Sequence, residues 1–218
     1  MFASAGRLFT ATFAMATLTV VAKPVEANTI VSMDVHFAGR SHSAGLLKAI
    51  WTEVSAIWSS YGVQVVAAPE CESEDGGGIV GSFDVAIEQR ATHKMKSNRL
   101  VLGLTYLQVP AIDHAPIRID YGAVEEVLEA LQLERLVMLT GHQGLESSDM
   151  GRALGRVLAH EIGHVLLLAP DHKPSGLMRA SYRPEDLVGI ARTSFTLSQL
   201  EIERLHRRAE RLSVLFLQ

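Results

Sequence analysis

The pentapeptide His160-Glu161-Ile162-Gly163-His164 constrains this chain of 218 residues more than any other segment. Positions four residues apart lie one above the other on the same face of an α-helix, so a helix would bring both imidazoles to one point. The flanks support a helix over residues 147–168. Ser147, Ser148 and Asp149 are types that cap a helix N-terminus, and Pro170 disfavours helical geometry in the residue before it.

Two stacked histidines with a glutamate between them are typical of a zinc hydrolase. His160 and His164 would bind Zn²⁺, and Glu161 would act as general base toward the attacking water. A catalytic zinc ion usually has three protein ligands and an open fourth position. The residues near enough to supply the third ligand are Asp171, His172, Glu185 and His142.

The remaining chain alternates predicted strands and helices. Period-two alternation indicates strands over residues 29–37, 62–68, 79–87, 100–107 and 117–121. Helical spacing of apolar residues indicates helices over residues 44–61, 124–131 and 197–212, the last beginning with a capping-box pattern at Thr196-Leu197-Ser198-Gln199. This order predicts a mixed sheet with helices packed on it, an α+β fold.

The N-terminus resembles a secretory signal peptide, because Arg7 precedes an uncharged apolar run over residues 8–21 and small residues follow. We expect cleavage after Ala27, with Ala22 as the alternative site. Residues 1–27 would then be the signal peptide and residues 28–218 a single domain. The expected location is outside the cytoplasm, secreted or periplasmic, with no stable membrane anchor after cleavage.

The composition limits the kinds of binding partner that we expect for this chain. The formal net charge of −4 does not favour binding to nucleic acid. Cys71 is the only cysteine, so an intramolecular disulfide is impossible. We expect a monomer that acts on a peptide or protein substrate.

The run from His160 to His172, followed by Ser175-Gly176-Leu177-Met178, resembles the metzincin clan of zinc metallopeptidases, in particular a divergent, matrixin-like branch of bacterial exported proteins. The resemblance covers residues 153–182. It implies a zincin/metzincin-like mixed β-sheet with long helices, an active-site helix, a Met-turn and a C-terminal helix.

By the same resemblance, His172 is the third zinc ligand, Met178 is the Met-turn residue and Tyr182 is a transition-state stabiliser. The usual pattern HExxHxxGxxH would place glycine at Leu167 and histidine at Pro170. Here the step from His164 to His172 is eight residues instead of six, which leaves Asp171 as the competing ligand.

The sequence therefore predicts an exported zinc-dependent metalloendopeptidase. We expect an extended substrate to add along a sheet edge, with residues 100–107 as the candidate strand. Two alternatives stay open: a non-catalytic binding domain that keeps the zincin fold, and a zinc hydrolase of a non-peptide amide or ester.

Overall fold

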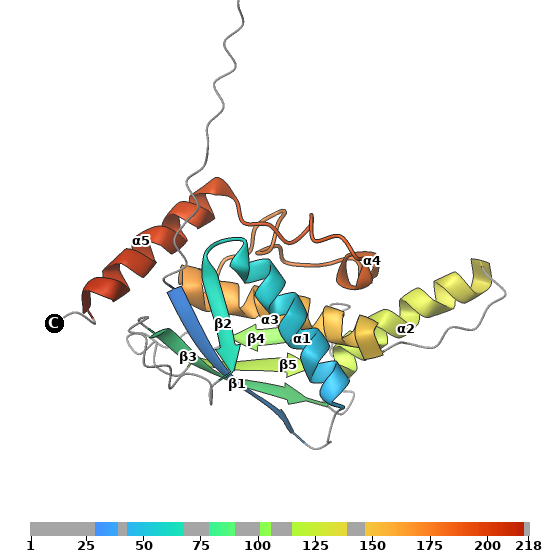
Figure 1. Ribbon diagram of the computed structural model, residues 1–218. Helices are drawn as coiled ribbons and strands as arrows, with labels where there is room; N and C mark the ends of the chain where they lie inside the picture. The colour runs from blue at the N-terminus through green and yellow to red at the C-terminus, as the bar shows by residue number, and fades with distance from the viewer. Residues whose placement is uncertain are drawn as a thin grey trace, which may run out of the picture.

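A five-stranded sheet underlies the structure, a computed structural model that describes residues 29–38, 43–67, 79–89, 101–105, 115–138 and 147–215. Its order is β2-β1-β3-β5-β4 (Figure 1). The strands are β1 (Thr29–Ala38), β2 (Val63–Ala67), β3 (Ile79–Glu88), β4 (Gly103–Thr105) and β5 (Ala115–Asp120). All neighbouring pairs are parallel except β4 and β5, which are antiparallel. The short β4 therefore lies at one edge of the described sheet.

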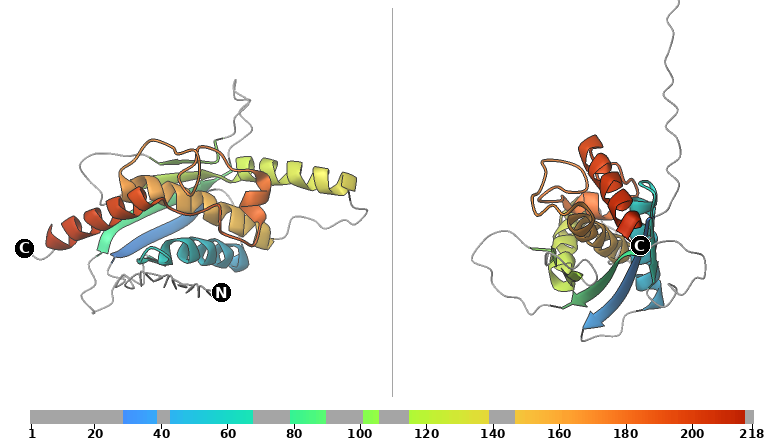
Figure 2. Two further views of the ribbon diagram at one scale, coloured as in Figure 1. Left: turned by 90° about the horizontal axis from the view of Figure 1, so that it is seen from above. Right: turned by 90° about the vertical axis from the view of Figure 1, so that its left-hand side faces the viewer.

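Two helices dominate the layer above the sheet. Helix α1 (Ala44–Ser59) lies beside α3 (Ser147–Leu167), and α3 also contacts β4 and β5 (Figures 1 and 2). The other helices are α2 (Tyr121–Met138), which follows β5 directly, the short α4 (Pro184–Val188) and α5 (Gln199–Leu215). None of the helices in the described part of the chain is both long and apolar enough to cross a bilayer.

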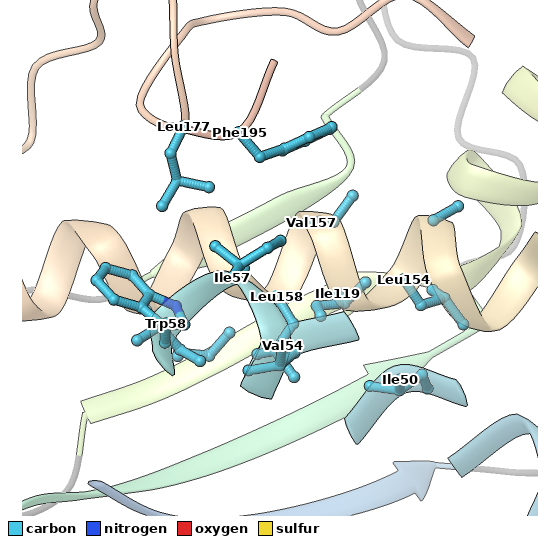
Figure 3. Packing of buried hydrophobic residues seen from close by; sticks show 14 of the residues in the cluster. Ile50, Val54, Ile57, Trp58, Ile119, Leu154, Val157, Leu158, Leu177 and Phe195 are labelled. Atoms are coloured by element: carbon cyan, nitrogen blue, oxygen red, sulfur yellow. The ribbon is translucent and has the colours of Figure 1, made fainter. Parts of the chain in front are cut away.

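The core forms between α1, α3 and the face of the sheet turned toward them. Val85, Ile87, Ile117 and Ile119 are buried on that face, and they alternate along β3 and β5 with residues that are exposed or half-buried. The helices contribute Ile50, Val54, Ile57 and Trp58 from α1 and Leu154, Val157, Leu158 and Ile162 from α3, several of which are drawn in Figure 3.

Glycines let α1 and α3 approach closely. A Cβ added at Gly151 would lie 2.4 Å from Cβ of Ala49, and one at Gly155 would lie 2.8 Å from Cβ of Glu53. These distances are too short for real carbon atoms. The close contact fixes where α3 runs relative to α1, and with it the turn of α3 that carries His160.

A buried ion pair joins α1, α3 and the segment after α4. Arg156 is fully buried, and its Nε lies 2.7 Å from Oε1 of Glu53. Nη2 of Arg192 lies 2.7 Å from the other oxygen of the same carboxylate. Arg156 also donates to the carbonyls of Asp186 and Ala191. Paired in this way, the charges hold residues 183–195 against α3.

The structure changes several predicted boundaries. Strand β4 has three residues within the predicted range 100–107, α2 begins at Tyr121 and extends to Met138, and α4 was not predicted. The N-terminal cap of α5 also lies two residues later than predicted. The reciprocal hydrogen bonds of the capping box join Ser198 and Glu201, whereas we expected them between Thr196 and Gln199. The proposed signal peptide, Cys71 and His142 lie outside the described residues.

Candidate metal centre

Three histidines converge at the C-terminal part of α3. His160 and His164 are buried on successive turns of the helix, and the exposed His172 returns to them from the segment that follows. One ring nitrogen from each lies within 4.8 Å of the others. Nε2 of His160 and Nε2 of His164 are 3.0 Å apart. The His172 ring stacks on His160 with centroids 5.3 Å apart and stands perpendicular to His164.

The other nitrogen of each buried imidazole is held by a backbone carbonyl. Nδ1 of His160 lies 2.7 Å from the oxygen of Leu177, and Nδ1 of His164 lies 2.6 Å from that of Ala169. A carbonyl oxygen only accepts, so Nδ1 carries the proton in both rings. Each Nε2 is therefore left with its lone pair directed at the cluster, the arrangement that backbone carbonyls commonly impose on metal-ligating histidines.

Electrostatics of the site favour a bound cation. Burial lowers the pKa of His160 to about 4 and also lowers the pKa of His164, so both rings are neutral at pH 7. Two Nε2 lone pairs 3.0 Å apart with no proton between them repel each other. Tetrahedral Zn²⁺ at about 2.0–2.1 Å from each nitrogen would accommodate ligands roughly 3.3 Å apart. The donor set and its spacing thus fit a zinc ion.

The end of α3 accounts for the long step to His172. The helix ends at Leu167, one residue earlier than predicted, and Leu168 adopts the left-handed region with φ of 46°. Ala169 N–H then donates to the carbonyl of His164 at 3.2 Å, while its own carbonyl receives Nδ1–H of the same histidine. Ala169 therefore both ends helix α3 and fixes the tautomer of His164.

Met178 lies under the histidine-bearing turn of α3. Its side chain is 1% exposed, and a Cβ added at Gly163 would lie 2.4 Å from its sulfur. Lys173 N–H donates to the carbonyl of Met178 at 2.7 Å, and the preceding Leu177 donates to the carbonyl of Thr196 at 2.8 Å. This turn places the Leu177 carbonyl against Nδ1 of His160 and so helps to hold that candidate metal ligand in position.

Glu161 is buried beside the sheet edge. Its side chain accepts a hydrogen bond from the Thr105 hydroxyl of β4, at 2.5 Å from Oε2. Burial raises the pKa of Glu161 to about 7, and the Thr105 hydrogen bond opposes that shift. A carboxyl group with such a pKa can take up and release a proton near neutral pH.

Tyr182 contacts the His160 ring, with centroids 5.7 Å apart and the rings nearly perpendicular. Its hydroxyl donates to the Leu177 carbonyl and is 3.0 Å from Nδ1 of His160, the nitrogen that faces away from the cluster. Its ring stacks on Phe195 at 5.0 Å, and burial raises the pKa of the phenol above its usual range. The predicted role in stabilising a transition state stays a prediction.

Two of the competing ligands, Asp171 and Glu185, are not part of this cluster. Within the described residues, the group that could hold a metal ion comprises the three histidines and excludes Asp171 and Glu185. Both of these carboxylates are exposed, and Glu185 lies on α4. Sequence reasoning did not identify Gly103 or Thr105, because nothing in a short strand signals contact with a helix 56 residues further on.

Comparisons with known proteins give little. No family model matches the chain, and no curated protein does. Among solved structures, one similar chain belongs to the GM1-bound form of the ECX AB5 holotoxin, with 15% sequence identity, a TM-score of 0.44, and coverage of 82% of this chain and 80% of that chain. A likeness of this size assigns no activity.

The α+β class is as predicted, but the finer description of the fold needs a correction. We expected a zincin/metzincin-like fold, and this expectation is withdrawn, because no family model matches the chain and the likeness to the AB5 holotoxin structure, at a TM-score of 0.44, lends it no support. The expectation rested on residues 153–182, and such a segment determines a local helix and turn but not the order of distant strands. The fold is therefore described by its own topology, α+β with the order β2-β1-β3-β5-β4.

Proposed function

We propose that this chain is an exported, zinc-dependent metalloendopeptidase. The observation that carries the proposal is the pair of neutral imidazoles whose Nδ1 atoms are tied to carbonyls and whose Nε2 lone pairs meet at 3.0 Å, with His172 beside them. The resemblance of residues 160–178 to the corresponding metzincin segment supports the same activity.

The roles of the residues follow from their positions. A Zn²⁺ ion held by His160, His164 and His172 would supply a Lewis acid that polarises the scissile carbonyl and lowers the pKa of a water molecule toward neutrality. Glu161 takes a proton from the attacking water onto its carboxylate and passes that proton to the leaving amine. The carbonyls of Leu177 and Ala169 keep the two buried imidazoles in the tautomer that binds metal.

The proposed substrate is an extended peptide. Strand β4 lies at the edge of the described sheet, and its Thr105 contacts Glu161. A peptide that added to this edge by backbone hydrogen bonds would run past the candidate base. The export of the protein rests on the N-terminal sequence alone.

The decisive experiment combines zinc content with hydrolysis. We expect the purified protein to bind about one zinc ion per chain and to cleave members of a mixed peptide library. His160→Ala should lose the zinc, whereas Glu161→Gln should keep the zinc and lose hydrolysis by roughly 100-fold or more. A Glu161→Gln variant with full activity would exclude the proposed base.

Glu185→Gln is a matched control, because it makes the same chemical change at an exposed carboxylate on α4. It should retain both zinc and hydrolysis. Zinc binding without cleavage of any peptide would refute the peptidase proposal in favour of a binding domain. Cleavage of only ester or non-peptide amide substrates would refute it in favour of another zinc hydrolase.

A further inference from the structure

The edge strand β4 supplies two residues to the side of Glu161. Side chains alternate between faces along a strand, so Gly103 and Thr105 lie on the same face. This face is turned toward α3. The Thr105 hydroxyl contacts Glu161 of α3, and a Cβ added at Gly103 would contact the same residue. Leu104 between them is 42% exposed.

The missing side chain of Gly103 makes room for Glu161. A Cβ added there would lie 2.6 Å from Oε1 and 2.9 Å from both Cδ and Cγ of Glu161. Three atoms of the glutamate would be in conflict with a single methyl group. Any larger residue at position 103 would therefore displace the carboxylate.

The Thr105 hydroxyl has two acceptors on the same residue. Oγ1 lies 2.5 Å from Oε2 of Glu161 and 3.2 Å from its backbone oxygen. While Glu161 is a carboxylate, the hydroxyl donates to Oε2.

We propose that Gly103 and Thr105 are positioning residues that hold the Glu161 carboxylate in one place through the space at position 103 and the hydroxyl at position 105. This inference rests on the proposed function, in which Glu161 is the general base. Because β4 is the strand expected to receive the substrate, the same strand aligns both the base and the peptide.

The test uses Thr105→Val, which removes the hydroxyl with little change in shape, and Thr105→Ser, which restores it. We expect Thr105→Val to lower kcat by about 10–100-fold, with little change in KM or bound zinc. Thr105→Ser should lie within about threefold of the wild type. Thr52→Val is the matched control, since its hydroxyl donates to the Lys48 carbonyl on the exposed face of α1.

A second measurement uses the metal-free protein. The side-chain carboxyl ¹³C resonance of Glu161, assigned by its absence in Glu161→Gln, should shift in Thr105→Val and stay in place in Thr52→Val. If Thr105→Val does not fold, Gly103→Ala takes its place, because the added methyl group should move the same resonance and lower kcat by a similar factor.

The outcomes separate the two proposals. A folded Thr105→Val variant with wild-type kcat and an unmoved Glu161 resonance would overturn the positioning role while leaving the zinc peptidase intact. Equal loss of kcat in Thr105→Val and Thr105→Ser would also overturn it, because the hydroxyl would then be irrelevant. If the wild type neither binds zinc nor cleaves peptides, the proposed function fails, and the carboxyl resonance alone decides whether β4 holds Glu161.

Discussion

The contact between Gly163 and Met178 permits a quantitative test of how the turn supports the histidine helix. A Cβ at position 163 would lie 2.4 Å from the Met178 sulfur and 3.2 Å from its Cε. Met178 is 1% exposed, so its side chain cannot swing into solvent. Overpacking of this kind destabilises by about 1–3 kcal/mol, and alanine gains about 1 kcal/mol over glycine within a helix. Gly163→Ala should therefore lower the free energy of unfolding by about 0–2 kcal/mol.

The double variant isolates the contact. Met178→Ala alone should lower the free energy of unfolding by about 2–5 kcal/mol, because it leaves a cavity. In that background the conflict at position 163 disappears, so Gly163→Ala should stabilise by up to about 1 kcal/mol. The coupling energy between the two positions should then be about 1–3 kcal/mol.

Urea denaturation of the metal-free proteins, followed by circular dichroism, would measure the four members of this cycle. The zinc affinity of each, measured by competition with a chelator, would show whether the turn also supports the candidate ligands. Additivity of the two substitutions to within about 0.5 kcal/mol would refute the reasoning, because residues in contact do not behave independently.

Three further predictions concern stability. Leu168→Gly should raise the free energy of unfolding by about 1 kcal/mol in urea denaturation, because φ is 46° and the side chain is 52% exposed; a loss would show that the leucine side chain matters more than the backbone strain. Arg156→Met should lower the free energy of unfolding by about 3 kcal/mol, and Arg192→Met by less than about 1 kcal/mol. Both side chains pair with the buried carboxylate of Glu53, but only Arg192 is partly exposed. Equal losses of stability in the two variants would contradict this reasoning. In metal-free Glu161→Gln, the free energy of unfolding should rise between about pH 4 and 6.5, because the pKa of His160 falls from 6.5 to about 4 on folding and the folded state binds fewer protons. The wild type should show a flatter profile, because the pKa of Glu161 is raised to about 7 and its slope has the opposite sign.

The elements with strong periodicity were predictable from the sequence. Helix α1 was expected over residues 44–61 and runs from Ala44 to Ser59, and α3 was expected over residues 147–168 and ends at Leu167. Both carry an apolar face long enough to outweigh local irregularities. The pairing of His160 with His164 followed from the same periodicity, because a spacing of four residues acts within one helix.

Short elements and distant contacts were not predictable. Helix α4 was missed because Arg183-Pro184 reads as a loop, although proline is well suited to the first turn of a helix and Asp186 completes the cap. Strand β4 begins later than predicted, since Val101 and Leu102 lie outside it and the described pairing with β5 starts at Gly103. Both are decided by a few hydrogen bonds to partners elsewhere in the chain, which leave little trace in local composition.

The sequence by itself determined that His160 and His164 share a helix face, that Glu161 lies between them, and that the helix ends near Pro170, because these are properties of neighbouring residues. Only the tertiary structure brought His172 beside the two histidines of α3 and placed Thr105 against Glu161. Those placements depend on where the chain returns after Leu168 and on which strand lies at the sheet edge. They are set by packing across the whole core, which couples residues that no local pattern connects.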